Sequence, residues 1–144
     1  MTSMKLKLEL DSLPYTIHRL PTSTPASVYF PLIEDQEWYS ITKTREEISL
    51  VVSHRYDTSN AEDPVLLPDD QHKISSGWRC FKVKGQLDFS LVGIMANLSG
   101  ALAEKAISVF VVSTYDTDYI LVNEESALPA KKVFESIGHT VEVL

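Results

Sequence analysis

Residues 107–122 read ISVFVVSTYDTDYILV, and this stretch decides the fold that we predict for the chain. Its two apolar runs are rich in β-branched and aromatic residues, which favour extended strands. The polar segment Tyr115–Asp118 between them has the composition of a tight turn. The stretch therefore predicts two antiparallel strands, Ile107–Ser113 and Tyr119–Val122, joined as a hairpin.

Regular elements are predicted on both sides of this hairpin. Before it, apolar residues recur at helical spacing and predict a helix from about Phe89 to Glu104, which follows a strand over Trp78–Lys84. After it, Ser126 is a candidate N-cap for a second helix, and Gly138 takes the position just past the end of that helix. A last strand covers Thr140–Leu144.

The order β-α-β-β-α-β over residues 78–144 is that of a ferredoxin-like unit, with its first and third strands in the centre of the sheet. The N-terminal half follows a similar order in outline, with strands at Lys5–Leu10 and Tyr15–Leu20, a short helical turn near Ser27–Phe30, and a hairpin of Trp38–Thr42 and Ile48–Ser53. We predict an α+β fold of two ferredoxin-like βαββαβ units, the first degenerate, packed side by side with antiparallel sheets. The two domains are residues 1–76 and 77–144.

The composition excludes several classes of protein. Apolar residues make up 44% and charged residues 23% of the chain, as in globular domains. A formal charge of −7 with scattered basic residues argues against nucleic-acid binding. The apolar runs are too short to span a membrane. One cysteine and no leader-like segment favour a reducing cytosolic or nuclear compartment, and we expect a cytoplasmic protein.

Catalytic patterns are missing from the sequence. The four histidines have no metal-ligand spacing with Asp, Glu or Cys. No glycine-rich phosphate loop and no nucleophile elbow is present. We therefore expect neither an enzyme nor a bound metal or cofactor.

Several segments carry a family resemblance: Gly77–Arg79, Gly85–Ser90, Ile107–Phe110 and Ser113–Val122. In these segments the sequence resembles small tandem ACT-domain proteins related to the cytosolic arginine sensors of the CASTOR family. It departs from them at Gln86, where relatives often carry proline. It also has room for two ACT units where the larger sensors have four, so a site made between different halves of such a sensor would here form between two chains.

The resemblance implies that a free amino acid binds where the loop after the first strand of an ACT unit meets a neighbouring unit. The start of the predicted helix offers backbone N–H groups to a carboxylate, and a nearby carboxylate side chain suits an ammonium or guanidinium group. Ser108 and Val109 match positions that contact the ligand in the arginine sensors. The candidate ligand-binding residues are Asp88, Phe89, Ser90, Leu91, Ser108, Val109, Phe110, Tyr115 and Asp116.

Each of these residues also has a purely structural interpretation. Asp88 fits an N-cap, Ser108 fits a solvent-facing serine of an edge strand, and Asp116 and Asp118 fit residues that shape a turn.

The apolar run Ile107–Val112 is predicted to lie at a sheet edge, where an unpaired strand invites association. It would pair with Trp38–Thr42 or with a second chain, and the crevice so formed is the predicted site. We therefore expect a non-catalytic regulatory homodimer that senses a free amino acid, with arginine as a candidate, at an ACT–ACT interface. The alternative is a ligand-free interaction module that docks a kinase or signalling complex.

Overall fold

The computed structural model describes residues 5–53, 71–84 and 93–144, and it divides into two compact units. The C-terminal unit consists of residues 1–12 together with 78–144, and the inserted unit consists of residues 13–77. The expected boundary near residue 77 coincides with one junction between the units. Residues 1–12, which we expected in the first domain, belong instead to the C-terminal unit.

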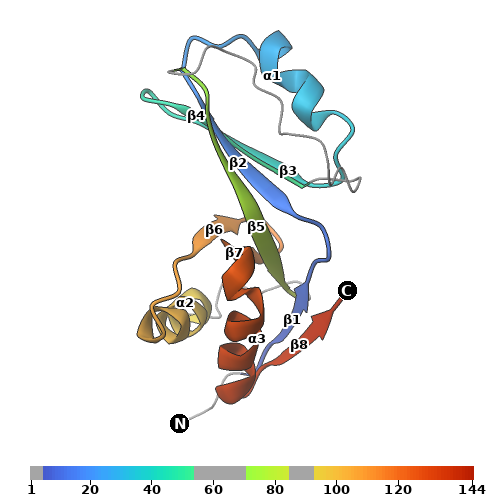
Figure 1. The fold of residues 1–144 in the computed structure, drawn as a ribbon, viewed down its shortest axis with the longest axis vertical. Coiled ribbons are helices and arrows are strands. Elements are labelled where there is room, and N and C mark those ends of the chain that lie inside the picture. Colours follow the sequence, from blue (N-terminus) through green and yellow to red (C-terminus); the bar gives the residue numbers. More distant parts are fainter. Residues whose placement is uncertain (1–4, 54–70, 85–92) are drawn as a thin grey trace. The chain divides into compact units, whose positions relative to one another are not determined.

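The sheet of the C-terminal unit has the strand order β8-β1-β5-β7-β6 (Figure 1). Its strands are β1 (Lys7–Leu10), the second part of β5 (Lys73–Val83), β6 (Phe110–Ser113), β7 (Asp118–Asn123) and β8 (Thr140–Val143). Its helices are α2 (Ile94–Glu104), the 3-10 turn η1 (Glu124–Ser126) and α3 (Ala127–Ser136). The run from β5 to β8 has the predicted order β-α-β-β-α-β, and β1 is an additional strand between β5 and β8.

The position of β1 differs from its expected place in the N-terminal domain. It runs antiparallel to β5 and parallel to β8. Leu8 and Leu10 are each 1% exposed and belong to the core of the C-terminal unit. The alternation of lysine and leucine identified the strand correctly, but such a pattern specifies which side chains are buried and not which strand lies alongside.

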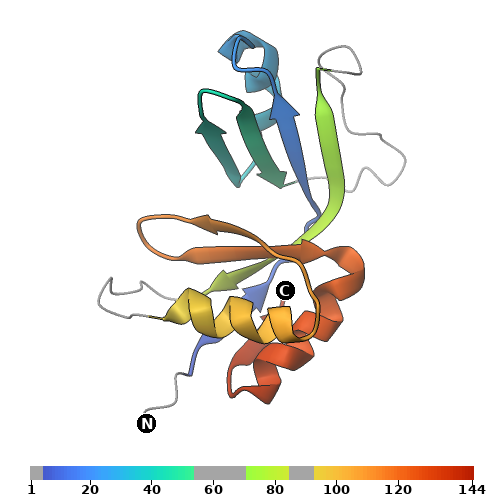
Figure 2. The ribbon, with the colours of Figure 1, turned by 90° about the vertical axis from the view of Figure 1, so that its left-hand side faces the viewer.

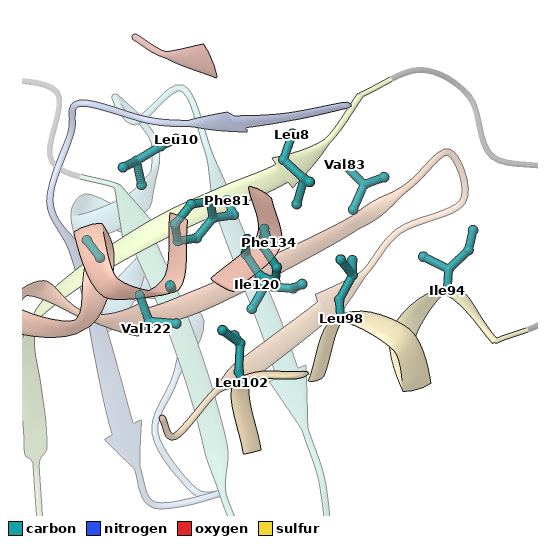
Figure 3. Packing of buried hydrophobic residues seen from close by; sticks show 12 residues of the cluster. Leu8, Leu10, Phe81, Val83, Ile94, Leu98, Leu102, Ile120, Val122 and Phe134 are labelled. Atoms are coloured by element: carbon teal, nitrogen blue, oxygen red, sulfur yellow. The ribbon is translucent and has the colours of Figure 1, made fainter. Parts of the chain in front are cut away.

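Helices α2 and α3 cover one face of this sheet (Figure 2). Leu98 and Leu102 of α2 are fully buried there, and the ring of Phe134 on α3 meets the ring of Phe81 edge to face at 5.1 Å (Figure 3). The predicted helical stripe is therefore confirmed as the packing face of α2.

The ends of the helices differ from the expectation at two positions. Helix α2 begins at Ile94, later than expected, because Gly93 before it has a φ of 88°, outside the range of a right-handed helix. Ser126 makes no capping hydrogen bond, since η1 leads directly into α3. Gly138 does end α3 as predicted: its φ is 100°, and the N–H of His139 donates to the carbonyl of Phe134.

The inserted unit has the strand order β3-β4-β2-β5, which is the ferredoxin-like order for strands two, three, one and four. Its elements are β2 (Tyr15–Leu20), α1 (Ala26–Ile33), β3 (Tyr39–Lys43), β4 (Ile48–Ser53) and the first part of β5. Helix α1 is longer than the expected turn, and its Ile33 packs on Leu20 and Leu50 of the sheet. The strand order supports the interpretation of this half as a degenerate copy.

The hairpins of the two units have the same turn. In the turn between β3 and β4, the N–H of Thr44 donates to the carbonyl of Glu47 at 2.8 Å, and Thr44 Oγ1 accepts from the N–H of Glu47. In the turn between β6 and β7, Thr114 and Thr117 make the same two bonds. Equivalent turns at equivalent places in the strand order are a second sign of an internal repeat.

Candidate functional site

Strand β6 is an edge strand, as predicted, because it pairs only with β7 in the described part of the chain. The bond from Thr114 to Thr117 fixes which of its backbone groups face β7. Hydrogen-bonded positions alternate along an antiparallel strand, so the peptide groups of Val111 and Ser113 face the open edge. This edge therefore presents both backbone donors and backbone acceptors.

Ser108 and Val109 lie immediately before this strand. Residues 107–109 have irregular backbone, so the strand is shorter than the one we predicted. The side chains of Ile107 and Val109 pack against the core, while Ser108 between them is exposed. No hydrogen bond with any described residue involves Ser108 or Val109. An exposed hydroxyl and peptide groups that have no partner among the described residues thus lie side by side on an anchored segment.

The backbone leading into this segment is strained. Helix α2 ends in the same hydrogen-bonded motif as α3, with the N–H of Ile107 donating to the carbonyl of Leu102. The position that glycine usually takes in this motif is filled by Ala106, with a φ of 57°. Left-handed backbone at a non-glycine residue costs on the order of 1–2 kcal/mol.

Phe110, Tyr115 and Asp116 complete the described candidates. Phe110 opens β6 and meets the ring of Trp78 edge to face at 6.3 Å. Tyr115, 77% exposed, and Asp116 lie at the tip of the hairpin. At about 3.3 Å per strand residue, the tip lies about 20 Å from Val109. The structure therefore separates the described candidates into two groups at opposite ends of β6.

The tip is held against the end of β5. Thr117 is buried, and its Oγ1 donates to the carbonyl of Val83, the last residue of β5, at 2.6 Å. Sequence reasoning missed this role, although a threonine between two aspartates in a turn was the available signal. The remaining candidates, Asp88, Phe89, Ser90 and Leu91, lie outside the described residues.

A hollow of about 330 Å³ lies along β1 and β8, at the edge of the same sheet that is opposite β6. It is lined by Lys7, Leu8, Lys84, Thr140, Val141 and Glu142, none of which was predicted as a site residue. Lys84 Nζ lies 2.9 Å from Glu9 Oε1, and this hydrogen bond together with the charge of Glu9 raises the pKa of Lys84. Lys84, one of the two lysines that line the hollow, is thus already engaged by a carboxylate.

Among the described residues, no three His, Cys, Asp or Glu side chains are grouped so as to hold a metal ion. No helix in the described ranges has the length and apolar character needed to cross a membrane. Cys80, the single cysteine, is 1% exposed.

A family model for the ACT domain matches residues 73–136, a range that contains strands β5, β6 and β7. The chain is an ACT-domain protein. It is related to the cytosolic arginine sensors: it is 30% identical over 139 residues to the "cytosolic arginine sensor for mTORC1 subunit 1" of Pongo abelii, covering 94% of this chain and 36% of that protein. The chain thus spans about a third of the length of this curated relative.

Solved structures with the same fold include protein Atu0741 of Agrobacterium tumefaciens. That structure is 28% identical, has a TM-score of 0.75 and is covered to 95%, with 98% of this chain aligned. The regulatory subunit of aspartate kinase from Thermus thermophilus has a TM-score of 0.65, with 94% of this ACT protein and 99% of that chain covered. At 10% identity, the second likeness concerns the fold alone.

Proposed function

We propose that this ACT protein is a non-catalytic regulator that binds a free amino acid at an interface between ACT units of two chains. The observation that carries the proposal is the open edge of β6, preceded by Ser108 and Val109, whose polar groups have no partner among the described residues. Arginine is the first ligand to test, because the related curated proteins are named as arginine sensors.

The chemistry of this edge suits a zwitterion. An α-carboxylate needs donors and an α-ammonium group needs acceptors, and the peptide groups of Val109 together with the Ser108 hydroxyl provide both. The formal charge of −7 also favours a cationic side chain on the ligand. The strained backbone at Ala106 supports this location, since residues in sparsely populated conformations concentrate at functional sites.

The separation of the candidate residues along β6 favours a site formed by two chains. A free amino acid cannot touch both Ser108 and Asp116 of one chain, because these residues lie at opposite ends of β6. One ligand touches both groups only if they come from different copies, so ligand binding would stabilise a dimer. The name of the arginine sensors also supports a cytoplasmic location.

A thermal-shift screen of the twenty amino acids, followed by calorimetry, tests the proposal. Ligand at 100 times its dissociation constant adds about 2.7 kcal/mol to the free energy of unfolding. We expect arginine to raise the melting temperature, and Ser108→Ala to weaken its binding while Ser136→Ala, at an exposed serine of α3, leaves it unchanged.

Two results would contradict the proposal. A flat response to all twenty amino acids would favour the alternative, an interaction module that docks a kinase or signalling complex without a ligand. Equal binding by both serine variants would place the ligand away from β6.

A further inference from the structure

The hollow along β1 and β8 has the size and the lining of a small-molecule site. Its volume of about 330 Å³ is that of a small ligand pocket. The side chains of Leu8 and Val141 pack into the core, on the face of the sheet that α2 and α3 cover (Figure 2). Because side chains alternate along a strand, those of Lys7, Thr140 and Glu142 lie on the opposite face. The hollow therefore has a floor of backbone and walls of polar side chains.

The backbone of this floor is already paired. The N–H of Thr140 donates to the carbonyl of Leu6 at 3.0 Å, and the N–H of Lys84 donates to the carbonyl of Lys7 at 2.8 Å. Strand β1 is thus bonded on both sides, by β5 and by β8. Side chains, and not peptide groups, must therefore recognise a molecule that fills the hollow.

The charges on this face of the sheet differ in sign from the charge of the whole chain, which is −7. Strands β1 and β8 contribute two glutamates to the face, and the three segments that form it contribute three lysines. These residues are Lys7, Lys82 and Lys84, with Glu9 and Glu142. A local excess of positive charge on an acidic protein favours an anionic ligand.

Two lysines of the hollow lie directly opposite each other. Leu8 is paired with Val83 in the register of β1 and β5, so the next pair is Lys7 and Lys84. Like charges at such a position repel. The ion pair of Lys84 with Glu9 uses one of the three donors of its ammonium group, and the Lys7 ammonium has no partner among the described residues. An anion between the two lysines would remove this repulsion.

We propose that the hollow binds a small phosphomonoester that carries hydroxyl groups, such as a sugar phosphate. Its phosphate group lies between Lys7 and Lys84 and accepts a hydrogen bond from the hydroxyl of Thr140. A phosphomonoester carries a charge of about −1.5 to −2 and three acceptor oxygens, so it can bond to both ammonium groups at once.

Glu142 selects for the hydroxyl groups of the ligand. Its carboxylate forms no ion pair with a described residue, and an ionised carboxylate can only accept hydrogen bonds. It would repel a bare phosphate but accept from the hydroxyls of a sugar. The inference goes beyond the amino-acid site proposed at β6 and does not depend on it.

Calorimetric titration of the full chain with ribose 5-phosphate tests the inference. We expect a dissociation constant of about 1 mM or lower. Ribose and succinate, which lack the phosphate group, should bind about tenfold more weakly or not at all. Lys7→Gln should raise the constant about tenfold or more, because a charge-assisted hydrogen bond is lost. Lys132→Gln is the matched control: it removes the same charge from an exposed position of α3 and should leave the constant unchanged.

Glu142→Gln tests the hydroxyl contact separately. Inorganic phosphate should bind more tightly to this variant than to wild type, because a repelling charge is gone. Ribose 5-phosphate should lose about threefold or more of its advantage over inorganic phosphate, since the hydrogen bonds to a charged acceptor become neutral ones. Equal gains for both ligands would assign Glu142 a purely electrostatic effect and overturn its proposed role.

Nuclear magnetic resonance locates the bound molecule. Ribose 5-phosphate should shift the amide signals of Leu8 and Val141 and leave that of Ser108 in place, which separates this site from the one at β6. If circular dichroism shows that Lys7→Gln does not fold, Thr140→Val takes its place and should weaken binding severalfold.

Three results overturn the inference. The first is the absence of heat and of signal shifts with about 10 mM ribose 5-phosphate, ten times the weakest affinity expected. The second is binding of succinate as tight as that of ribose 5-phosphate, which would make the hollow a general carboxylate site. The third is an equal dissociation constant for Lys7→Gln and Lys132→Gln.

Discussion

The two hairpins of this molecule share a turn but differ in how that turn is attached to the rest of the unit. At the fourth turn position the C-terminal unit has Thr117, whose buried hydroxyl bonds to the carbonyl of Val83 at 2.6 Å. The inserted unit has Glu47, whose carboxylate lies 3.8 Å from Arg19 Nε, with both side chains more than 40% exposed. Both attachments reach the end of the strand that begins the βαββαβ order of their unit, β5 or β2.

The difference shows how a repeated backbone geometry can be kept while its energetics change. A buried hydrogen bond to a carbonyl leaves an unsatisfied acceptor when it is lost, whereas an exposed ion pair returns both partners to water. The hairpin of the C-terminal unit should therefore be the more firmly attached of the two.

Removing the Thr117 hydroxyl should lower the free energy of unfolding more than any other change to the two hairpins. Thr117→Val keeps the shape of the side chain but leaves the buried carbonyl of Val83 without its donor, at a cost of about 1–3 kcal/mol. Urea unfolding followed by circular dichroism measures the loss, and Thr117→Ser should recover much of it. A Thr117→Val chain as stable as wild type would show that water replaces the hydroxyl.

The two helix ends provide the next test. Gly138→Ala should lower the free energy of unfolding by about 1 kcal/mol, because alanine disfavours positive φ. The cost is one of backbone conformation alone, since a Cβ at Gly138 would meet no atom within 4 Å.

Ala106→Gly should act in the opposite direction. It relieves the left-handed alanine at the end of α2 and should stabilise the chain by about 0.5–1 kcal/mol. Urea midpoints of both variants check the pair. If Ala106→Gly stabilises the chain but weakens amino-acid binding, the strain before Ser108 serves the site.

Acid should destabilise the C-terminal unit through His139. Its Nδ1 accepts from the N–H of Leu6 at 3.0 Å, and its Nε2 lies 2.7 Å from Asn97 Oδ1, so the bonded ring is neutral with its proton on Nε2. Burial lowers the pKa of His139 below its ordinary value of 6.5. The unfolded chain therefore binds the proton first, and stability present above pH 6.5 is lost as the pH falls through the folded pKa.

His139→Gln is the variant that tests this pH dependence. Glutamine can accept from Leu6 and donate to Asn97 without titrating, so the loss of stability between pH 7.5 and 5 should be smaller than in wild type. Urea midpoints at the two pH values measure it. An equal loss in both proteins would assign the acid sensitivity elsewhere, for example to His72, which is also buried and has a lowered pKa.

The smallest effect is expected at the exposed ion pair. Glu47→Gln should change the free energy of unfolding by less than about 1 kcal/mol, and less still in high salt. The same denaturation assay at low and high salt checks it. A larger loss would mean that the hairpin of the inserted unit depends on this pair as much as the other hairpin depends on Thr117.

Much of the fold could be predicted from local patterns. The strands Tyr15–Leu20 and Ile48–Ser53 were predicted with their observed bounds, because alternation and turn residues are properties of adjacent positions. The partner of β1 could not be predicted, since Leu8 and Leu10 would be buried equally well in either unit. Strand pairing between distant segments leaves little trace in a single sequence.

The edge strand beside the candidate site could be predicted, because a short apolar run without charge stands out in the sequence. The sequence placed Ser108 and Val109 within this strand, whereas they precede it. Their separation from Asp116 depends on β6 lying between them, and the roles of Thr117 and Ala106 depend on contacts with Val83 and Leu102. Such contacts are made in three dimensions and have no local signature.

Because β1 lies between β5 and β8, cutting the chain at residue 77 would not yield an intact domain. A fragment of residues 77–144 would lack the only described partner of β8 and would leave the places of Leu8 and Leu10 empty in the core. The N–H of Asp11 donates to the carbonyl of Cys80 at 2.9 Å. The points where the chain leaves the C-terminal unit and returns to it are therefore neighbours. A minimal single-domain version should therefore be made by excision, joining Ser12 to Trp78 through a few flexible residues.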